Sequence, residues 1–204
     1  MTPTDIETLI EARAKRGRRT FLMVVAVAVL PIIAAYFAFF TGVGVPQKTV
    51  NAGTLFPTPL AITQLSEDYN EAFPEKKWRL FLPVTQTCDK ACEAMLYTTR
   101  QVHIRLDREA NRLERVLINL GGANSETLDK ALLDRYKPMK KIDVADDEWQ
   151  RWLKGAGLEL PQGDYYLLVD QEGYAMMLYS NQTGNQLLKD LKHALKYSID
   201  YQSK

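Results

Sequence analysis

The chain has 204 residues, of which 26 are Lys or Arg and 25 are Asp or Glu, so its formal net charge is +1. Hydrophobic residues make up 46% and charged residues 25%. These values are typical of globular proteins and exclude a disordered, collagen-like or disulfide-dense chain. The near-neutral charge also argues against a protein that binds nucleic acid through broad phosphate contacts.

The charges are distributed unevenly along the chain. Residues 1–19 carry five basic and three acidic side chains, residues 20–47 carry none, and residues 48–204 carry 21 basic and 22 acidic ones. We therefore expect three parts: a short basic N-terminus over 1–19, an uncharged apolar segment, and a near-neutral soluble domain.

The apolar segment has the length of a membrane-spanning helix. Every residue from Phe21 to Phe40 is apolar or aromatic, and about 20 helical residues cross a bilayer core. We predict a transmembrane helix over 20–43 that is retained as a signal anchor. The alternative is a cleaved signal peptide, whose apolar region is usually shorter, about 7–15 residues.

The basic cluster over 13–19 directly precedes this helix. The positive-inside rule places such a cluster in the cytoplasm. We therefore expect a single-pass protein of a bacterial inner (plasma) membrane, with a cytoplasmic N-terminus and a periplasmic C-terminal domain. Glycines and prolines are frequent over 44–60, which we interpret as a linker, so that the periplasmic domain covers 61–204.

The periplasmic domain alternates β-prone and helix-prone segments. Strands are predicted over 78–84, 113–120, 165–170 and 174–179, and helices over 91–106, 125–136, 146–154 and 185–197. The last two strands form a hairpin with Gly173 at its turn. This order predicts an α/β domain with a central sheet flanked by helices on both faces.

Two cysteines are the strongest chemical signal in this domain. Cys88 and Cys92 form the sequence C-D-K-A-C after a strand and at a predicted helix start. Helix N–H groups and Lys90 would stabilise a thiolate there, whereas Asp89 and Glu93 oppose it. The spacing places both sulfurs on one face of the first turn, close enough to form a disulfide or to share one soft metal ion such as Cu(I). A purely structural disulfide is the alternative.

The order strand, CxxxC loop and helix resembles the thioredoxin-like Sco/SenC proteins, which are membrane-anchored and help to assemble the CuA centre of cytochrome c oxidase. The run Tyr166-Leu-Leu-Val-Asp-Gln-Glu-Gly173 is similar to the late strand and D-P-[DE]-G turn of that family, with Gln171 in place of Pro. The resemblance implies a thioredoxin-like fold with a central mixed sheet, and it implies that Cys88 and Cys92 are the paired thiols of the family.

The sequence departs from the Sco/SenC pattern at two further positions. Glu93 follows the second cysteine, where the family has Pro, and Gln162 stands near the position of the His that completes the copper site of the family. Pro161 matches the place where thioredoxin-like proteins often have a cis-proline. Because Gln162 stands near that position, the distal His of the Sco/SenC copper site is absent from its usual place.

Other side chains were weighed as substitute metal ligands. His103 is expected to be a partly buried packing residue, and His193 to face solvent. Met95 lies one turn beyond Cys92, and Met176 and Met177 are expected to point to opposite faces of a strand, so that one could supply a soft sulfur ligand.

Three functions are compatible with these residues. In the first, the protein is a thiol-disulfide oxidoreductase in which Cys88 attacks a disulfide and Cys92 resolves the mixed disulfide. In the second, the same cysteines carry Cu(I); in the third, the domain is a non-catalytic docking subunit with a structural disulfide. The expected partner is the cytochrome c oxidase subunit that bears CuA, or another assembly factor, and no nucleic acid is expected to bind.

Overall fold

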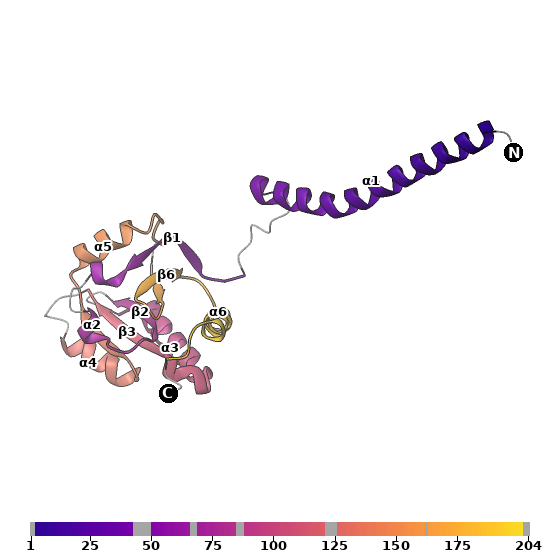
Figure 1. Ribbon diagram of the computed structural model, residues 1–204. Helices are drawn as coiled ribbons and strands as arrows, with labels where there is room; N and C mark the ends of the chain where they lie inside the picture. The colour runs from indigo at the N-terminus through magenta and orange to yellow at the C-terminus, as the bar shows by residue number, and fades with distance from the viewer. Residues whose placement is uncertain are drawn as a thin grey trace. The chain divides into compact units, whose positions relative to one another are not determined.

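The computed structural model describes residues 3–42, 50–65, 69–84, 88–120, 126–161 and 163–201. The chain divides into two compact units, Met1–Thr49 and Val50–Lys204 (Figure 1). Each unit is built from a different sequence pattern, an apolar helix in the first and an α/β alternation in the second.

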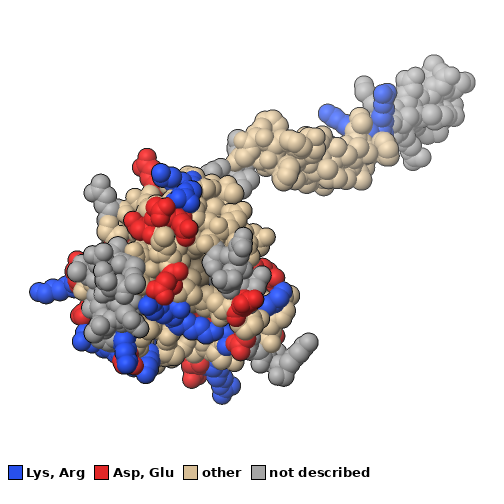
Figure 2. All heavy atoms as spheres, turned by 90° about the vertical axis from the view of Figure 1, so that its left-hand side faces the viewer, with Lys and Arg blue, Asp and Glu red and all other residues tan. Residues whose placement is uncertain are grey.

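The first unit is formed by one long helix, α1 (Pro3–Thr41). Its part from Arg16 to Thr41 is 26 residues long, has a mean hydropathy of 2.6, and is long and apolar enough to cross a membrane. Beyond its arginines this part shows neither basic nor acidic side chains (Figure 2). The predicted membrane-spanning helix is thus present as a continuous helix, and it also includes Pro31.

The second unit contains a mixed sheet of six strands in the order β1-β6-β5-β2-β3-β4. Strands β2, β3 and β4 run parallel, whereas β5 and β6 form an antiparallel hairpin and β1 pairs antiparallel with β6. The strands are β1 (Thr54–Ala61), β2 (Trp78–Val84), β3 (Leu113–Asn119), β4 (Lys140–Asp143), β5 (Tyr166–Val169) and β6 (Tyr174–Tyr179). The expected central mixed sheet is confirmed.

Helices cover both faces of this sheet (Figure 1). They are α2 (Tyr69–Ala72), α3 (Lys90–Arg105), α4 (Glu126–Arg135), α5 (Asp146–Lys154) and α6 (Gly184–Tyr197), with short 3-10 helices at Ile62–Gln64 and Asp107–Arg112. Buried side chains of α3, α4 and α6 form one hydrophobic cluster, and those of α5 form a second with the opposite side of the strands. The α/β architecture predicted from the element order is therefore confirmed.

Strand β2 lies in the interior of the sheet, and side chains on both of its faces are buried. Leu80 and Leu82 point into the cluster beneath α3 and α6, while Phe81 points into the cluster beneath α5. All three are fully buried, as expected for a strand covered on both faces. The chain therefore leaves the C-terminal end of β2 at a fixed point and continues toward Cys88.

The linker predicted over 44–60 extends too far and must be corrected. Strand β1 begins at Thr54, and Asn51 already contacts the domain through a hydrogen bond to the Gly53 carbonyl. Pro57 and Pro59 contributed to the linker interpretation. Strand β1 nevertheless lies at the edge of the sheet, where a missing N–H donor is tolerated, and its register with β6 is interrupted between Leu55 and Leu60. Strand β4 was likewise missed, because it is only four residues long and carries two lysines.

The expectation that Met176 and Met177 point to opposite faces is wrong. The pairing of β5 with β6 is irregular here: Leu168 faces Met177 while Val169 faces Ala175, which leaves Met176 as an extra residue. Such a β-bulge interrupts the alternation of a strand. Both methionines consequently pack on the cluster beneath α3 and α6.

Candidate functional site

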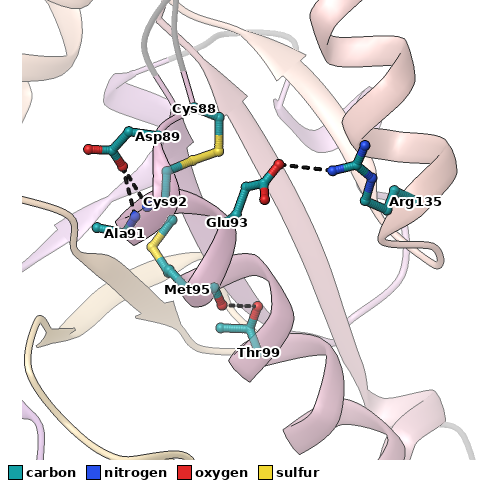
Figure 3. Close-up of a disulfide and its surroundings, with 8 residues drawn as sticks. All are labelled: Cys88, Asp89, Ala91, Cys92, Glu93, Met95, Thr99 and Arg135. Carbon is teal, nitrogen blue, oxygen red and sulfur yellow. Dashed lines mark hydrogen bonds and ion pairs between the residues drawn. A yellow bond between two sulfur atoms is a disulfide. The ribbon is translucent and has the colours of Figure 1, made fainter.

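The site centres on a disulfide between Cys88 and Cys92, whose Cα atoms are 5.2 Å apart (Figure 3). Cys88 is half-buried and lies in the loop after β2, before α3 begins at Lys90. Cys92 is in the first turn of α3 and only 4% exposed. The two sulfurs do come together as the spacing indicated, although Cys88 precedes the helix rather than forming part of its first turn.

Asp89 is the N-cap of α3. Its Oδ1 accepts hydrogen bonds from the backbone N–H groups of Ala91 and Cys92, both at 2.9 Å (Figure 3). These are the donors that the sequence analysis assigned to a thiolate, so a carboxylate already occupies them in this structure. Asp89 is thus a helix cap as well as an opposing charge, and an Asp directly before a helical pattern is the sequence signal for such a cap.

The second acidic neighbour, Glu93, is paired. Its carboxylate forms an ion pair of 2.9 Å with Arg135 of α4, and both side chains are largely exposed. Lys90, between the cysteines, is also exposed. Of the two acidic neighbours, Glu93 is thus neutralised by an ion pair, whereas the Asp89 carboxylate accepts the backbone N–H groups of the first turn of α3.

Beneath the disulfide, α3 is held by a buried arginine of β3. Arg115 is 2% exposed and donates hydrogen bonds to the Leu96 carbonyl at 2.8 Å and to the Tyr136 carbonyl at 2.7 Å. It also donates to the hydroxyl of Thr99, which in turn donates to the Met95 carbonyl. Burial lowers the pKa of Arg115 to about 10. This side chain fixes the position of α3 against β3 and the end of α4.

A groove of about 460 Å³ runs along α3 beside the disulfide. Its walls include Ala91 and Met95 of α3, Asp164 just before β5, and Tyr166, the first residue of β5. Burial, with a smaller contribution from the Asp89 carboxylate, raises the pKa of Asp164. Among the described residues, no hydrogen-bond partner faces the buried hydroxyl of Tyr166. The groove thus has mixed polar and apolar walls and one acidic side chain, Asp164.

The expected substitute metal ligands are not gathered at the disulfide. His103 is half-buried, with its Nε2 3.1 Å from the Leu113 carbonyl, and burial lowers its pKa. His193 is exposed on α6 and packs against the ring of Tyr197 at 4.8 Å. Both histidines lie as the sequence analysis expected. Met95 is 8% exposed and packs in the hydrophobic cluster that Cys88 also contacts. Its thioether is the one nearest in sequence to the two cysteines.

The donor set does not fit a copper site of the Cys2His kind. The described residues contain no group of three His, Cys, Asp or Glu side chains that could hold a metal ion. Gln162, at the position of the distal His, lies outside the described residues. The peptide bond before Pro161 is trans, so Pro161 is not the cis-proline common in thioredoxin-like proteins; within the described ranges the cis bond is Lys137–Pro138.

Comparison with known proteins identifies the domain. Residues 78–198 match the model of a family described as the transmembrane-like, thioredoxin-like, C-terminal domain. The chain belongs to this family. The matched region of this transmembrane-like, thioredoxin-like domain runs from the first residue of β2 to the residue after α6, and thus includes both cysteines. No curated protein matches the chain.

Solved structures agree with this fold. ScoI of Arabidopsis thaliana with copper bound has a TM-score of 0.50 and 10% identity, covering 72% of this chain and 99% of that one. Yeast Sco1 has a TM-score of 0.50 and 14% identity, with coverage of 71% and 97%. BsSco, a member of the Sco family of cytochrome c oxidase assembly proteins, has 14% identity and a TM-score of 0.44, with coverage of 61% and 83%. The resemblance to Sco proteins is confirmed at the level of the fold.

Proposed function

We propose that the transmembrane-like, thioredoxin-like domain carries out thiol-disulfide exchange with a partner protein during assembly of the CuA centre of cytochrome c oxidase. The observation that carries the proposal is the asymmetric disulfide at the junction of β2 and α3. Cys88 is half-buried and therefore within reach of a partner, whereas Cys92 is buried behind it. This arrangement provides one sulfur for attack and one for resolution.

In the proposed reaction, the reduced Cys88 thiolate attacks a disulfide of the partner. A Cys88–partner disulfide forms, and the first partner sulfur leaves as a thiolate. The Cys92 thiolate then attacks the Cys88 sulfur, which forms the Cys88–Cys92 disulfide and releases the second partner sulfur. Two electrons pass from the cysteine pair to the partner, and a dithiol donor of the same compartment returns the pair to its reduced form.

The proposed partner is the oxidase subunit that bears CuA, or another assembly factor with a cysteine pair. The proposal places the protein in a bacterial inner membrane, with its basic N-terminus in the cytoplasm and the disulfide in the periplasm. It is supported by the arginines Arg16, Arg18 and Arg19 directly before the uncharged part of α1, and by the oxidising compartment that a stable disulfide requires.

The proposal is tested by trapping the intermediate. Cys92→Ser leaves the attacking sulfur without its resolving partner, so a mixed disulfide with the partner should accumulate and be recovered with the full-length chain. Cys88→Ser is the matched control, because it retains one cysteine but removes the accessible one. Either substitution should lower the CuA content of the oxidase, as measured by its absorbance and copper-to-enzyme ratio.

Two results would overturn exchange as the function. Unchanged CuA content in both variants would favour a docking subunit with a structural disulfide. Tight binding of one Cu(I) by the reduced chain, dependent on both cysteines, with no trapped mixed disulfide, would favour copper carriage instead.

A further inference from the structure

A second groove, of about 730 Å³, lies at the opposite end of the sheet from the disulfide. Trp78, which begins β2, lines this groove, while Cys88 follows the other end of that strand. Seven strand residues separate these two ends by about 20 Å. The groove is therefore not part of the thiol site described above.

The floor of the groove is apolar. It is formed by side chains of the sheet and of α6, namely Trp78, Leu168, Met176, Met177, Ala194 and Tyr197. The bulge in β6 contributes to this surface because it turns both methionines toward α6. Methionine side chains are flexible and adapt to the shape of an apolar ligand. A groove of this volume and lining is suited to a hydrocarbon chain.

The rim of the groove is basic. Lys189 and Lys192 of α6 line it together with Lys196, and all three side chains are exposed. Within the described residues, none of these lysines forms an ion pair with a carboxylate. The one acidic residue that lines the groove is Asp190, and its carboxylate already accepts hydrogen bonds from other groups of the protein.

Asp190 is engaged by three donors. Its Oδ2 accepts hydrogen bonds from the backbone N–H groups of Ala52 at 2.8 Å and Gly53 at 3.0 Å, and from the Tyr179 hydroxyl at 3.1 Å. It is 7% exposed. The charge presented at the mouth of the groove is thus positive, which complements a negatively charged headgroup.

The covalent connection to the membrane identifies the source of such a ligand. Val50, which lines the groove and is 77% exposed, follows Thr41 at the end of α1 by nine residues. Nine residues of fully extended chain span at most about 32 Å. Lipids of the bilayer that α1 is long and apolar enough to cross are the most abundant apolar molecules available to a domain tethered by so short a segment.

We propose that this groove binds an acyl chain of an anionic membrane phospholipid, with the headgroup phosphate beside Lys189 and Lys192. The acyl chain covers Trp78 and the two methionines, and the phosphate replaces solvent around the lysine ammonium groups. Lipid binding would hold the domain beside the membrane with the disulfide at its far end. This inference is independent of the exchange reaction, since it uses none of the residues of the thiol site.

The proposal is tested with the full-length chain in phosphatidylcholine nanodiscs that contain a small fraction of brominated phosphatidylglycerol. Bromine atoms on an acyl chain quench tryptophan fluorescence by contact. Trp78 is one of three tryptophans and lines the groove, whereas Trp149 and Trp152 belong to the cluster on the other face of the sheet. We therefore expect a loss of about one third of the fluorescence, and none from brominated phosphatidylcholine at the same fraction.

Charge-reversal variants decide between the lysine rim and general membrane contact. Lys189→Glu with Lys192→Glu should abolish the quenching, whereas the matched control Lys130→Glu with Lys154→Glu reverses the same number of exposed charges elsewhere and should retain it. All four positions are exposed, so the fold should be unaffected, which circular dichroism checks. The proposal is overturned if wild-type protein is not quenched, if both double variants are quenched equally, or if the two brominated lipids quench equally.

Discussion

Asp89 Oδ1 lies 2.9 Å from the backbone nitrogen of Cys92, so the carboxylate that caps α3 accepts the N–H group of one of the two disulfide cysteines. A capping carboxylate stabilises the helix, but it also adds a negative charge to the segment between Cys88 and Cys92, which opposes ionisation of the thiols when the disulfide is reduced. The same carboxylate is therefore expected to stabilise the start of α3 and to lower the reactivity of the reduced thiols.

Replacing Asp89 separates these two effects. Asn also caps helices well but carries no charge, so Asp89→Asn should raise the rate at which reduced Cys88 reacts with iodoacetamide at neutral pH by about three- to tenfold. The rate is measured in a Cys92→Ser background. Asp89→Ala should additionally lower the free energy of unfolding by about 1 kcal/mol, because the cap is lost. An unchanged or slower reaction of the Asn variant would contradict the electrostatic role.

Arg115 should be among the most sensitive positions for stability. Arg115→Met keeps much of the side-chain volume but leaves the carbonyls of Leu96 and Tyr136 without their buried donor, so the free energy of unfolding should fall by about 2–4 kcal/mol. Urea unfolding followed by tryptophan fluorescence measures this change. Arg108→Met, at an exposed position, is the matched control and should change stability by less than about 0.5 kcal/mol.

The hydrogen bonds to Asp190 should hold the first residues of the domain in place. Asp190→Ala removes the acceptor of the Ala52 and Gly53 amides, which should then exchange with deuterium much faster than in the wild-type protein. Hydrogen–deuterium exchange with mass spectrometry detects this locally. Asp147→Ala removes an exposed carboxylate of α5 and should leave the exchange of these amides unchanged. Slow exchange at residues 52–53 in the Asp190 variant would contradict the assignment.

His103 should make the domain sensitive to mild acid. Burial lowers its pKa below 6.5 in the folded state, so the unfolded chain binds the proton more readily than the folded one. Stability is therefore complete above pH 6.5 and decreases as the pH falls from 6.5 toward the folded-state pKa. The melting temperature of His103→Gln should fall less between pH 7.5 and pH 5.5 than that of the wild-type protein. Parallel decreases in both would show that other groups cause the loss.

The sequence was sufficient to predict the elements whose patterns are strong and local. Strand β2 and helix α5 have the predicted bounds, because one is a continuous apolar run and the other begins with acidic residues and ends at Gly155. The proximity of the two sulfurs also followed from the spacing of the cysteines, although the spacing left a disulfide and a shared metal ion equally open. In each case, the residues that determine the structure lie within a few positions of one another.

The features that were missed depend on residues distant in sequence. Strand β1 contains two prolines and is recognisable only from its edge position beside β6. The bulge that brings Met176 beside Met177 arises from pairing with β5, and no property of β6 alone reveals it. The buried Arg115 looked like an ordinary charge in a strand until its acceptors on α3 and α4 were known.

The attachment of residues 52–53 to Asp190 has a mechanical consequence. Any force that the membrane exerts through the N-terminal helix reaches the domain first at these amides, and the Asp190 carboxylate passes it to α6. The helix that carries the disulfide is α3, whose start is fixed separately by Asp89 and whose middle is fixed by Arg115. The anchor is thus attached to the domain at α6, a point separate from the two contacts that fix the start and the middle of the disulfide-bearing helix.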